Sequence, residues 1–200
     1  METVLMASAR RRAHRNTGFT LLEILVALVI VTFGLLGLAA LHVRVQQASF
    51  EAYNRAQALV LLEAMVSRIN ANRYTAPCYA ITGTGGTPYL GVADSGYVGT
   101  ITCSGYGDPG TQQLAVNDLT DWDATLRGTT ERIGAANAGG ALGARGCVSF
   151  DATTSTYTVA VAWQGLVDGP VPANACGANR YGAEAQRRVI WTTLKIATLT

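Results

Sequence analysis

Residues 18–41 read GFTLLEILVALVIVTFGLLGLAAL, and this stretch decides the fold. Eighteen consecutive residues of it, 24–41, carry no charge. At 1.5 Å per residue they would form a helix about 27 Å long, close to the roughly 30 Å hydrocarbon core of a bilayer. Counted from Phe19, the same helix would measure about 34 Å. The stretch is therefore long enough to span a membrane.

The charges around this stretch are unevenly distributed. Four arginines precede it and Arg44 follows it, which predicts that residues 1–18 are cytoplasmic and that the bulk of the chain lies outside. Residues 19–200 hold 11 basic and 12 acidic side chains, so nothing in their charge favours nucleic acid as a partner. The composition, 49% apolar and 14% charged, excludes a disordered chain.

Glu23 interrupts the apolar stretch five residues in, counted from Phe19. A carboxylate inside a membrane helix costs several kcal/mol unless it is paired, so it marks a function. A carboxylate that snorkels to the cytoplasmic headgroups is the plain alternative. A secretory signal peptide is a poor match, because no small-residue cleavage site with a polar break follows Ala39 and Ala40. A simple signal anchor stays open.

The run Gly18-Phe19-Thr20-Leu21-Leu22-Glu23 resembles the class III signal of type IV pilins and pseudopilins. The resemblance implies that a prepilin peptidase cuts between Gly18 and Phe19 and that the new amino group of Phe19 is N-methylated. It also implies that Glu23 pairs with the terminal amine of a neighbouring subunit. Each of these groups is costly alone in lipid, and side by side they offset one another. Translation from Met1 or from Met6 remains open.

One long helix is expected over residues 19–73, because no proline precedes Pro77. Apolar or small residues recur every three or four positions from Leu41 to Ile69. The helix would be about 80 Å long, with residues 19–41 in the membrane and the amphipathic residues 42–73 lying across a sheet. Its two glycines either allow close helix contact or local melting, or are merely tolerated in lipid; they are Gly34 and Gly37.

The remainder, residues 74–200, predicts a periplasmic globular domain and, with the long helix, an α+β fold. Trp122 would belong to its core. The two strands around residues 151–155 would form an antiparallel hairpin in a small sheet. The expected elements are a loop over 78–110, a helix over 112–126, a loop over 128–144, strands over 147–150 and 156–163, a loop over 165–172 and a last strand over 188–198.

Four cysteines lie on the outer side of the membrane, where an oxidising periplasm would pair them. Three pairings are possible, and Cys78–Cys103 with Cys147–Cys176 is favoured because each bond joins sequence neighbours and clips a loop-rich stretch. Each closed loop would contribute roughly 3–4 kcal/mol in the chain-entropy model. A zinc site is disfavoured, because the sequence has no Cys-x-x-Cys and no nearby histidine.

Catalytic chemistry is not indicated. The only histidines are His14 and His42, so the globular part has no Ser-His-Asp or Cys-His arrangement, and neither a metal nor a cofactor is implied. Arg187 with Arg188 is interpreted as an edge-strand charge pair. A cluster of three carboxylates is interpreted as a solvated face or a helix cap rather than an acid/base pair: Asp118, Asp121 and Asp123.

Within the family, the chain is most similar to the PilV-like minor pilins, the type IV pilus modification proteins. That resemblance implies a subunit that helps to prime pilus assembly, with the pilus tip as one position open to it. Its partners would be minor and major pilins, the prepilin peptidase and the inner-membrane assembly platform. A type II secretion minor pseudopilin and a signal-anchored periplasmic binding protein are the alternatives. The similar residues are 25–30 and 34–38 in the helix, then 117–119 with Trp122, 159–165, 176–177 and 187–189.

Overall fold

The computed structural model describes residues 18–130, 132–134, 136–137 and 139–196. The leader arginines, Met6 and His14 lie outside the described residues, as does the end of the predicted last strand. The chain divides into two units, Met1–Val45 and Gln46–Thr200, which are described separately.

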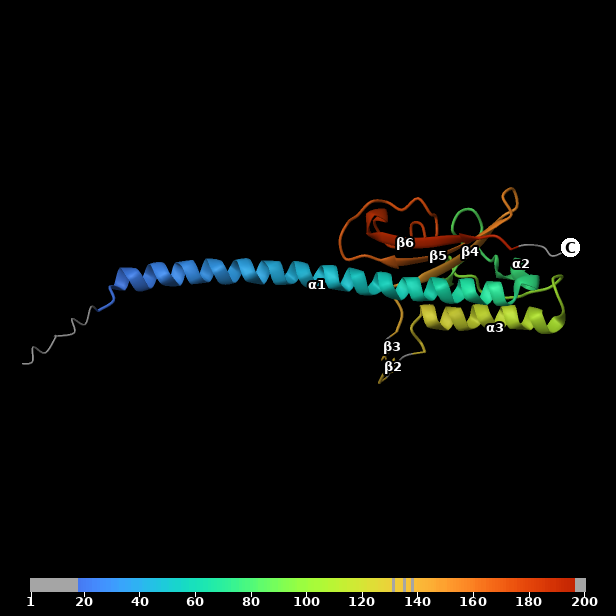
Figure 1. Cartoon of the computed structure of the whole chain (residues 1–200), viewed down its shortest axis with the longest axis horizontal. Coiled ribbons are helices and arrows are strands. Elements are labelled where there is room, and N and C mark those ends of the chain that lie inside the picture. Colours follow the sequence, from blue (N-terminus) through green and yellow to red (C-terminus); the bar gives the residue numbers. More distant parts are fainter. Residues whose placement is uncertain (1–17, 131, 135, 138, 197–200) are drawn as a thin grey trace, which may run out of the picture. The chain divides into compact units, whose positions relative to one another are not determined.

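The described part of the first unit is the amino-terminal part of helix α1 (Leu21–Ala71), and it stays helical through Gly34 and Gly37 (Figure 1). The helix begins two residues after Phe19 and carries Glu23 in its first turn. Thr32 directs its hydroxyl back onto the helix, where it donates to the carbonyl of Val29 at 2.8 Å. The apolar segment thereby satisfies the one hydroxyl that it holds after Thr20.

The second unit is built on a four-stranded antiparallel sheet with the order β1-β4-β5-β6. The predicted hairpin is confirmed: β4 and β5 pair with Val148 opposite Val159. β2 and β3 form a separate two-stranded ribbon. The strands are β1 (Leu90–Gly91), β2 (Arg132–Ile133), β3 (Ala136–Asn137), β4 (Arg145–Asp151), β5 (Thr156–Gln164) and β6 (Arg187–Leu194).

Four helical segments accompany the carboxyl-terminal half of α1. They are η1 (Arg73–Thr75), α2 (Ala76–Tyr79), α3 (Pro109–Leu126) and η2 (Glu184–Gln186). Figure 1 shows α3 running beside this half of α1. Between them, Trp122 is 1% exposed and its indole N–H donates to the carbonyl of Leu61 at 2.9 Å, so its predicted place in the core is confirmed.

The core joins one face of α1 to α3 and to one face of the sheet. α1 buries Ala58, Leu61, Leu62, Met65 and Ile69, which recur at helical spacing. Val148, Val159, Val161 and Trp163 meet them from the sheet, where alternate residues of β5 point to the same side. The predicted α+β architecture, an apolar amino-terminal helix packed on an antiparallel sheet, is therefore confirmed.

Several predicted boundaries were wrong. The third helix begins at Pro109 rather than at residue 112, because Asp108 accepts hydrogen bonds from the backbone N–H groups of Gly110 and Thr111 and caps it. The predicted loop over 78–110 contains the end of α2 and the short strand β1, and the predicted loop over 128–144 contains β2 and β3. The long helix ends at Ala71 rather than at residue 73, and β6 ends at Leu194.

Candidate functional site

The start of α1 is organised by Thr20. Its hydroxyl oxygen accepts the N–H of Glu23 at 3.3 Å, and its carbonyl accepts the N–H groups of Glu23 and Ile24 at 3.1 and 3.3 Å. Thr20 is thus the N-cap, and Glu23 stands at the third helical position, the arrangement of half a capping box. The positive end of the helix dipole favours a carboxylate at this position.

The two residues that precede Thr20 belong to no helix or strand. Gly18 and Phe19 are exposed and lie outside α1. A peptidase must take its substrate in an extended form, so the peptide bond between these two residues is available without unwinding the helix. The predicted processing residues and Glu23 therefore lie within one short segment at the start of α1.

The helix around Glu23 exposes an apolar surface on all sides. Phe19 and Leu21 are about four-fifths exposed, and every described residue up to Val45 is exposed within the chain. Among the described residues, α1 is the one helix long and apolar enough to cross a membrane. A surface of this kind needs lipid or other apolar helices around it. In such surroundings the Glu23 carboxylate needs a cationic partner.

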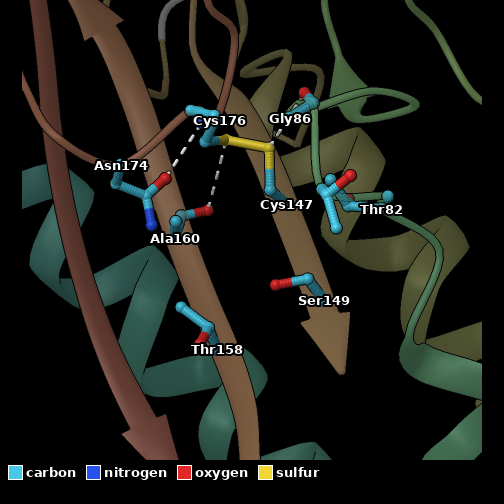
Figure 2. Close-up of a pocket in the computed structure, with 11 residues that line it drawn as sticks. Thr82, Gly86, Cys147, Ser149, Thr158, Ala160, Asn174 and Cys176 are labelled. Atoms are coloured by element: carbon cyan, nitrogen blue, oxygen red, sulfur yellow. Dashed lines mark hydrogen bonds between the residues drawn. A yellow bond between two sulfur atoms is a disulfide. The ribbon is translucent and has the colours of Figure 1, made fainter. Parts of the chain in front are cut away.

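Two disulfides brace the globular unit, and they are the pair favoured from the sequence. Cys78 is bonded to Cys103, and Cys147 is bonded to Cys176. The second bond joins β4 to the segment between β5 and β6. Figure 2 shows it beside a small hollow on the sheet face opposite α1, where the N–H of Cys176 donates to the Oδ1 of Asn174 at 2.9 Å.

This hollow is lined mainly by small and uncharged groups. Ser149 and Thr158 stand opposite each other on β4 and β5, and Thr82 lies across β4 from Thr158 (Figure 2). Thr82 already donates its hydroxyl to the carbonyl of Pro88 at 2.8 Å and accepts the N–H of Val148 at 3.1 Å. The hollow offers no charged group to a ligand. Among the described residues, no group of three or more His, Cys, Asp or Glu side chains could hold a metal ion.

A buried cluster around Arg145 was not predicted from the sequence. Its side chain is buried and pairs with the Oδ2 of Asp94 at 2.8 Å. The guanidinium lies 4.4 Å from the ring centre of Tyr181 and 5.3 Å from that of Tyr89. Burial alone would raise the pKa of Asp94, but hydrogen bonds from Arg145, Tyr89 and the backbone of Gly96 hold the pKa at about 2.

The predicted solvated face of three carboxylates was wrong for two of them. Asp118 accepts the hydroxyl of Tyr79, and Asp123 is buried, where its Oδ1 accepts the N–H of Gly91 at 2.7 Å. Asp121 is largely exposed. Burial and the Asp118 carboxylate raise the pKa of Tyr79, so this phenol stays protonated and donates. These carboxylates therefore hold α3 to its neighbours and form no acid/base pair.

Arg187 and Arg188 lie on an edge strand, β6, as interpreted, but the charge of Arg187 does not face solvent. Its side chain is buried and lies 2.7 Å from Glu184. Its guanidinium also donates to three backbone carbonyls, those of Pro172, Asn174 and Cys176. Arg187 thus holds the long segment before β6 in place. The neighbouring Arg188 is partly buried and donates to the carbonyls of Val167 and Ala185.

Comparison with known proteins finds one match. Residues 13–39 match the family model described as the prokaryotic N-terminal methylation motif. No curated protein and no solved structure matches the chain. The match spans Gly18, Phe19 and Glu23, the residues that lie at the start of α1.

The chain thus combines the prokaryotic N-terminal methylation motif with an exposed apolar helix and an antiparallel sheet, an arrangement that amounts to a pilin-like α+β fold. Its motif implies processing by prepilin peptidase, anchoring in the inner membrane and assembly with pilins.

Proposed function

We propose that this chain is a minor pilin, of the PilV-like kind, that takes part in priming the assembly of type IV pili. Residues 1–18 are a leader that is removed, 19–41 are the membrane half of the helix, 42–73 are its amphipathic half and 74–200 are the periplasmic domain. The protein waits in the inner membrane and then enters the filament with other minor and major pilins.

The observation that carries this proposal is the position of Glu23. The carboxylate stands in the first turn of a helix whose described amino-terminal part is apolar and exposed, close to the exposed, non-helical Gly18–Phe19 junction. Cleavage at that junction creates a terminal ammonium group four residues away from the carboxylate in the sequence. Because a carboxylate and an ammonium group are each costly in an apolar environment, contact between neighbouring subunits offsets both costs and sets their register.

If Glu23 contacts a neighbouring subunit, entry into the pilus depends on its charge, whereas folding and membrane insertion do not. Glu23→Gln and Glu23→Leu are expected to leave the protein folded and inserted in the membrane, while its recovery with sheared pili falls at least tenfold. Thr32→Val is the matched control, since it alters a polar residue of the same apolar run without touching the carboxylate. Normal pilus numbers and normal co-purification of the Glu23 variants with pilins would refute the proposal.

The secretion pseudopilin alternative shares the motif and the helix, so disruption of the gene distinguishes the two. A minor pilin is expected to be needed for surface pili and twitching motility, and a pseudopilin for export of secreted proteins. Loss of export with normal piliation would replace the proposed function by its alternative.

A further inference from the structure

The edge of the main sheet at β6 presents unpaired peptide groups. Among the described strands, β6 pairs only with β5, and it does so over its whole length from Arg187 to Leu194. The N–H of Gly165 donates to the carbonyl of Gln186, and this bond shows which residues of β6 direct their peptide groups towards β5. In an antiparallel pair every second residue then faces away from its partner. On β6 the outward peptide groups left for a further strand are those of Val189, Trp191 and Thr193, since the N–H of Arg187 donates to the carbonyl of Glu184.

Two hollows that share Ile190 lie along this edge, between β6 and one flank of α1, and together they are called the groove. Its floor includes Val189 to Trp191, and its wall is a stripe of α1 residues at helical spacing, among them Ala52, Arg55, Leu59 and Val66. Leu59 is 43% exposed although it lies beside the core. The sheet therefore ends one strand short of covering this flank of the helix.

The end of the groove near Arg55 holds two hydrogen-bond donors that lack acceptors. Trp163 lines the groove and is 3% exposed, yet its indole N–H has no partner among the described residues. Arg55 is exposed and makes no ion pair in the described part of the chain. Glu51, the nearby carboxylate, is already engaged, because it accepts the N–H of Leu166 at 2.8 Å and lies 3.8 Å from Arg188. This end of the groove thus favours an incoming acceptor with negative charge.

We propose that the β6 edge binds an extended segment of a partner protein as a fifth strand, with an acidic side chain against Trp163 and Arg55. Backbone pairing would satisfy the outward groups of Val189 and Trp191, and apolar side chains of the segment would cover Leu59 and Val66. A helix laid in the groove would cover the apolar stripe but leave the edge peptide groups unpaired. The inference goes beyond the proposed function, because it concerns only the globular unit.

The three tryptophans make this testable in the full chain in detergent micelles. The probe is a synthetic nonapeptide of alternating valine and threonine with a central glutamate. Binding is expected to shift the indole ¹⁵N–¹H resonance of Trp163, assigned with Trp163→Phe. The indole of Trp122 is the internal control, since it already donates to Leu61. A peptide with glutamine at the centre is expected to bind about tenfold more weakly, and one with alternate peptide nitrogens methylated is expected not to bind.

A pair of variants at one position separates backbone pairing from side-chain contact. Trp191→Pro removes an outward N–H while leaving the β5 ladder intact, as edge strands tolerate. Trp191→Thr removes the same indole and keeps the N–H. The proline variant is expected to bind the glutamate peptide at least tenfold more weakly than the parent chain, and the threonine variant less than threefold more weakly. Both variants are expected to keep thermal unfolding midpoints close to that of the parent chain. No shift of Trp163 at millimolar peptide, equal binding of the methylated peptide or equal loss in both variants would overturn the proposal.

Discussion

The side-chain oxygen of Thr20 accepts the backbone N–H of Glu23 at 3.3 Å, so the residue beside the proposed processing site holds the turn that carries the Glu23 carboxylate. The same threonine carbonyl accepts the N–H of Ile24. Two polar residues, Thr20 and Glu23, therefore interrupt the apolar run in different roles. Thr20 orders the first turn, and Glu23 supplies the charge.

This relationship predicts a local effect of removing the cap. Thr20→Val is expected to raise the hydrogen-exchange rate of the Glu23 amide about fivefold, since an N-cap contributes about 1 kcal/mol. Thr20→Ser keeps an acceptor oxygen and is expected to leave the rate within twofold. Thr32→Val is the control, because that hydroxyl bonds to a carbonyl inside the helix. Equal rates in Thr20→Val and the parent would show that the hydroxyl does not hold the turn.

Packing between α3 and β4 predicts an energetic coupling. A methyl group on Gly146 would lie 2.5 Å from the ring of Trp122, so Gly146→Ala is expected to reduce the free energy of unfolding by about 1–3 kcal/mol. In the Trp122→Phe background the added cost should shrink by at least about 0.5 kcal/mol, because the smaller ring makes room. Denaturant unfolding measures both, with Gly85→Ala as an expected near-neutral control. Strict additivity would contradict the contact.

The two disulfides are expected to differ in how they are reduced. Cys147 and Cys176 are 4% and 2% exposed, whereas Cys103 is only partly buried. Under native conditions dithiothreitol should therefore open Cys78–Cys103 first, as seen by alkylation and peptide mass mapping. Replacing both Cys147 and Cys176 by alanine should cost roughly 3–4 kcal/mol, since the bond spans a sequence separation of 29 residues. Reduction in the opposite order would contradict the burial pattern.

The Arg145 cluster predicts an acid-dependent loss of stability. The pKa of Asp94 is lowered from its usual value near 3.8 to about 2, so its contribution is fully present above about pH 4. As the pH falls towards 2 the carboxylate is protonated and about 1–2 kcal/mol is lost. Asp94→Asn should be less stable than the parent at pH 7 and should lack this part of the pH dependence between 4 and 2. A parallel pH dependence in both proteins, measured by denaturant unfolding, would rule out the role of Asp94.

The long helix, the hairpin and the last strand could be predicted because each has a strong local pattern. The buried face of each element shows as a periodicity of apolar residues within a short stretch of sequence. The helix has such a pattern from Leu41 to Ile69, and the strand has one over Thr156–Gln164. The methylation motif could be read for a similar reason, since its parts are adjacent in the chain.

What could not be predicted depends on contacts between distant residues. β1 is two residues long and has no periodicity, and it is held partly by the Gly91 N–H bonding to Asp123, 32 residues later. Arg187 is buried because backbone carbonyls accept hydrogen bonds from its guanidinium. Since every residue has such a carbonyl, the sequence does not show which of them meet at Arg187. The start of α3 is different, because Asp108 followed by Pro109 is a helix-start pattern that can be recognised in the sequence alone.

The central claim is that this chain is a processed pilin-like subunit whose new terminus meets Glu23 of a neighbour. Its most direct test is the intact mass and amino-terminal sequence of the protein purified from wild-type membranes. The account predicts a chain that begins at Phe19 and carries one extra methyl group on its amine. A chain that still begins at Met1 or Met6 in cells with an active prepilin peptidase would contradict the account, and the helix would then be an ordinary membrane anchor.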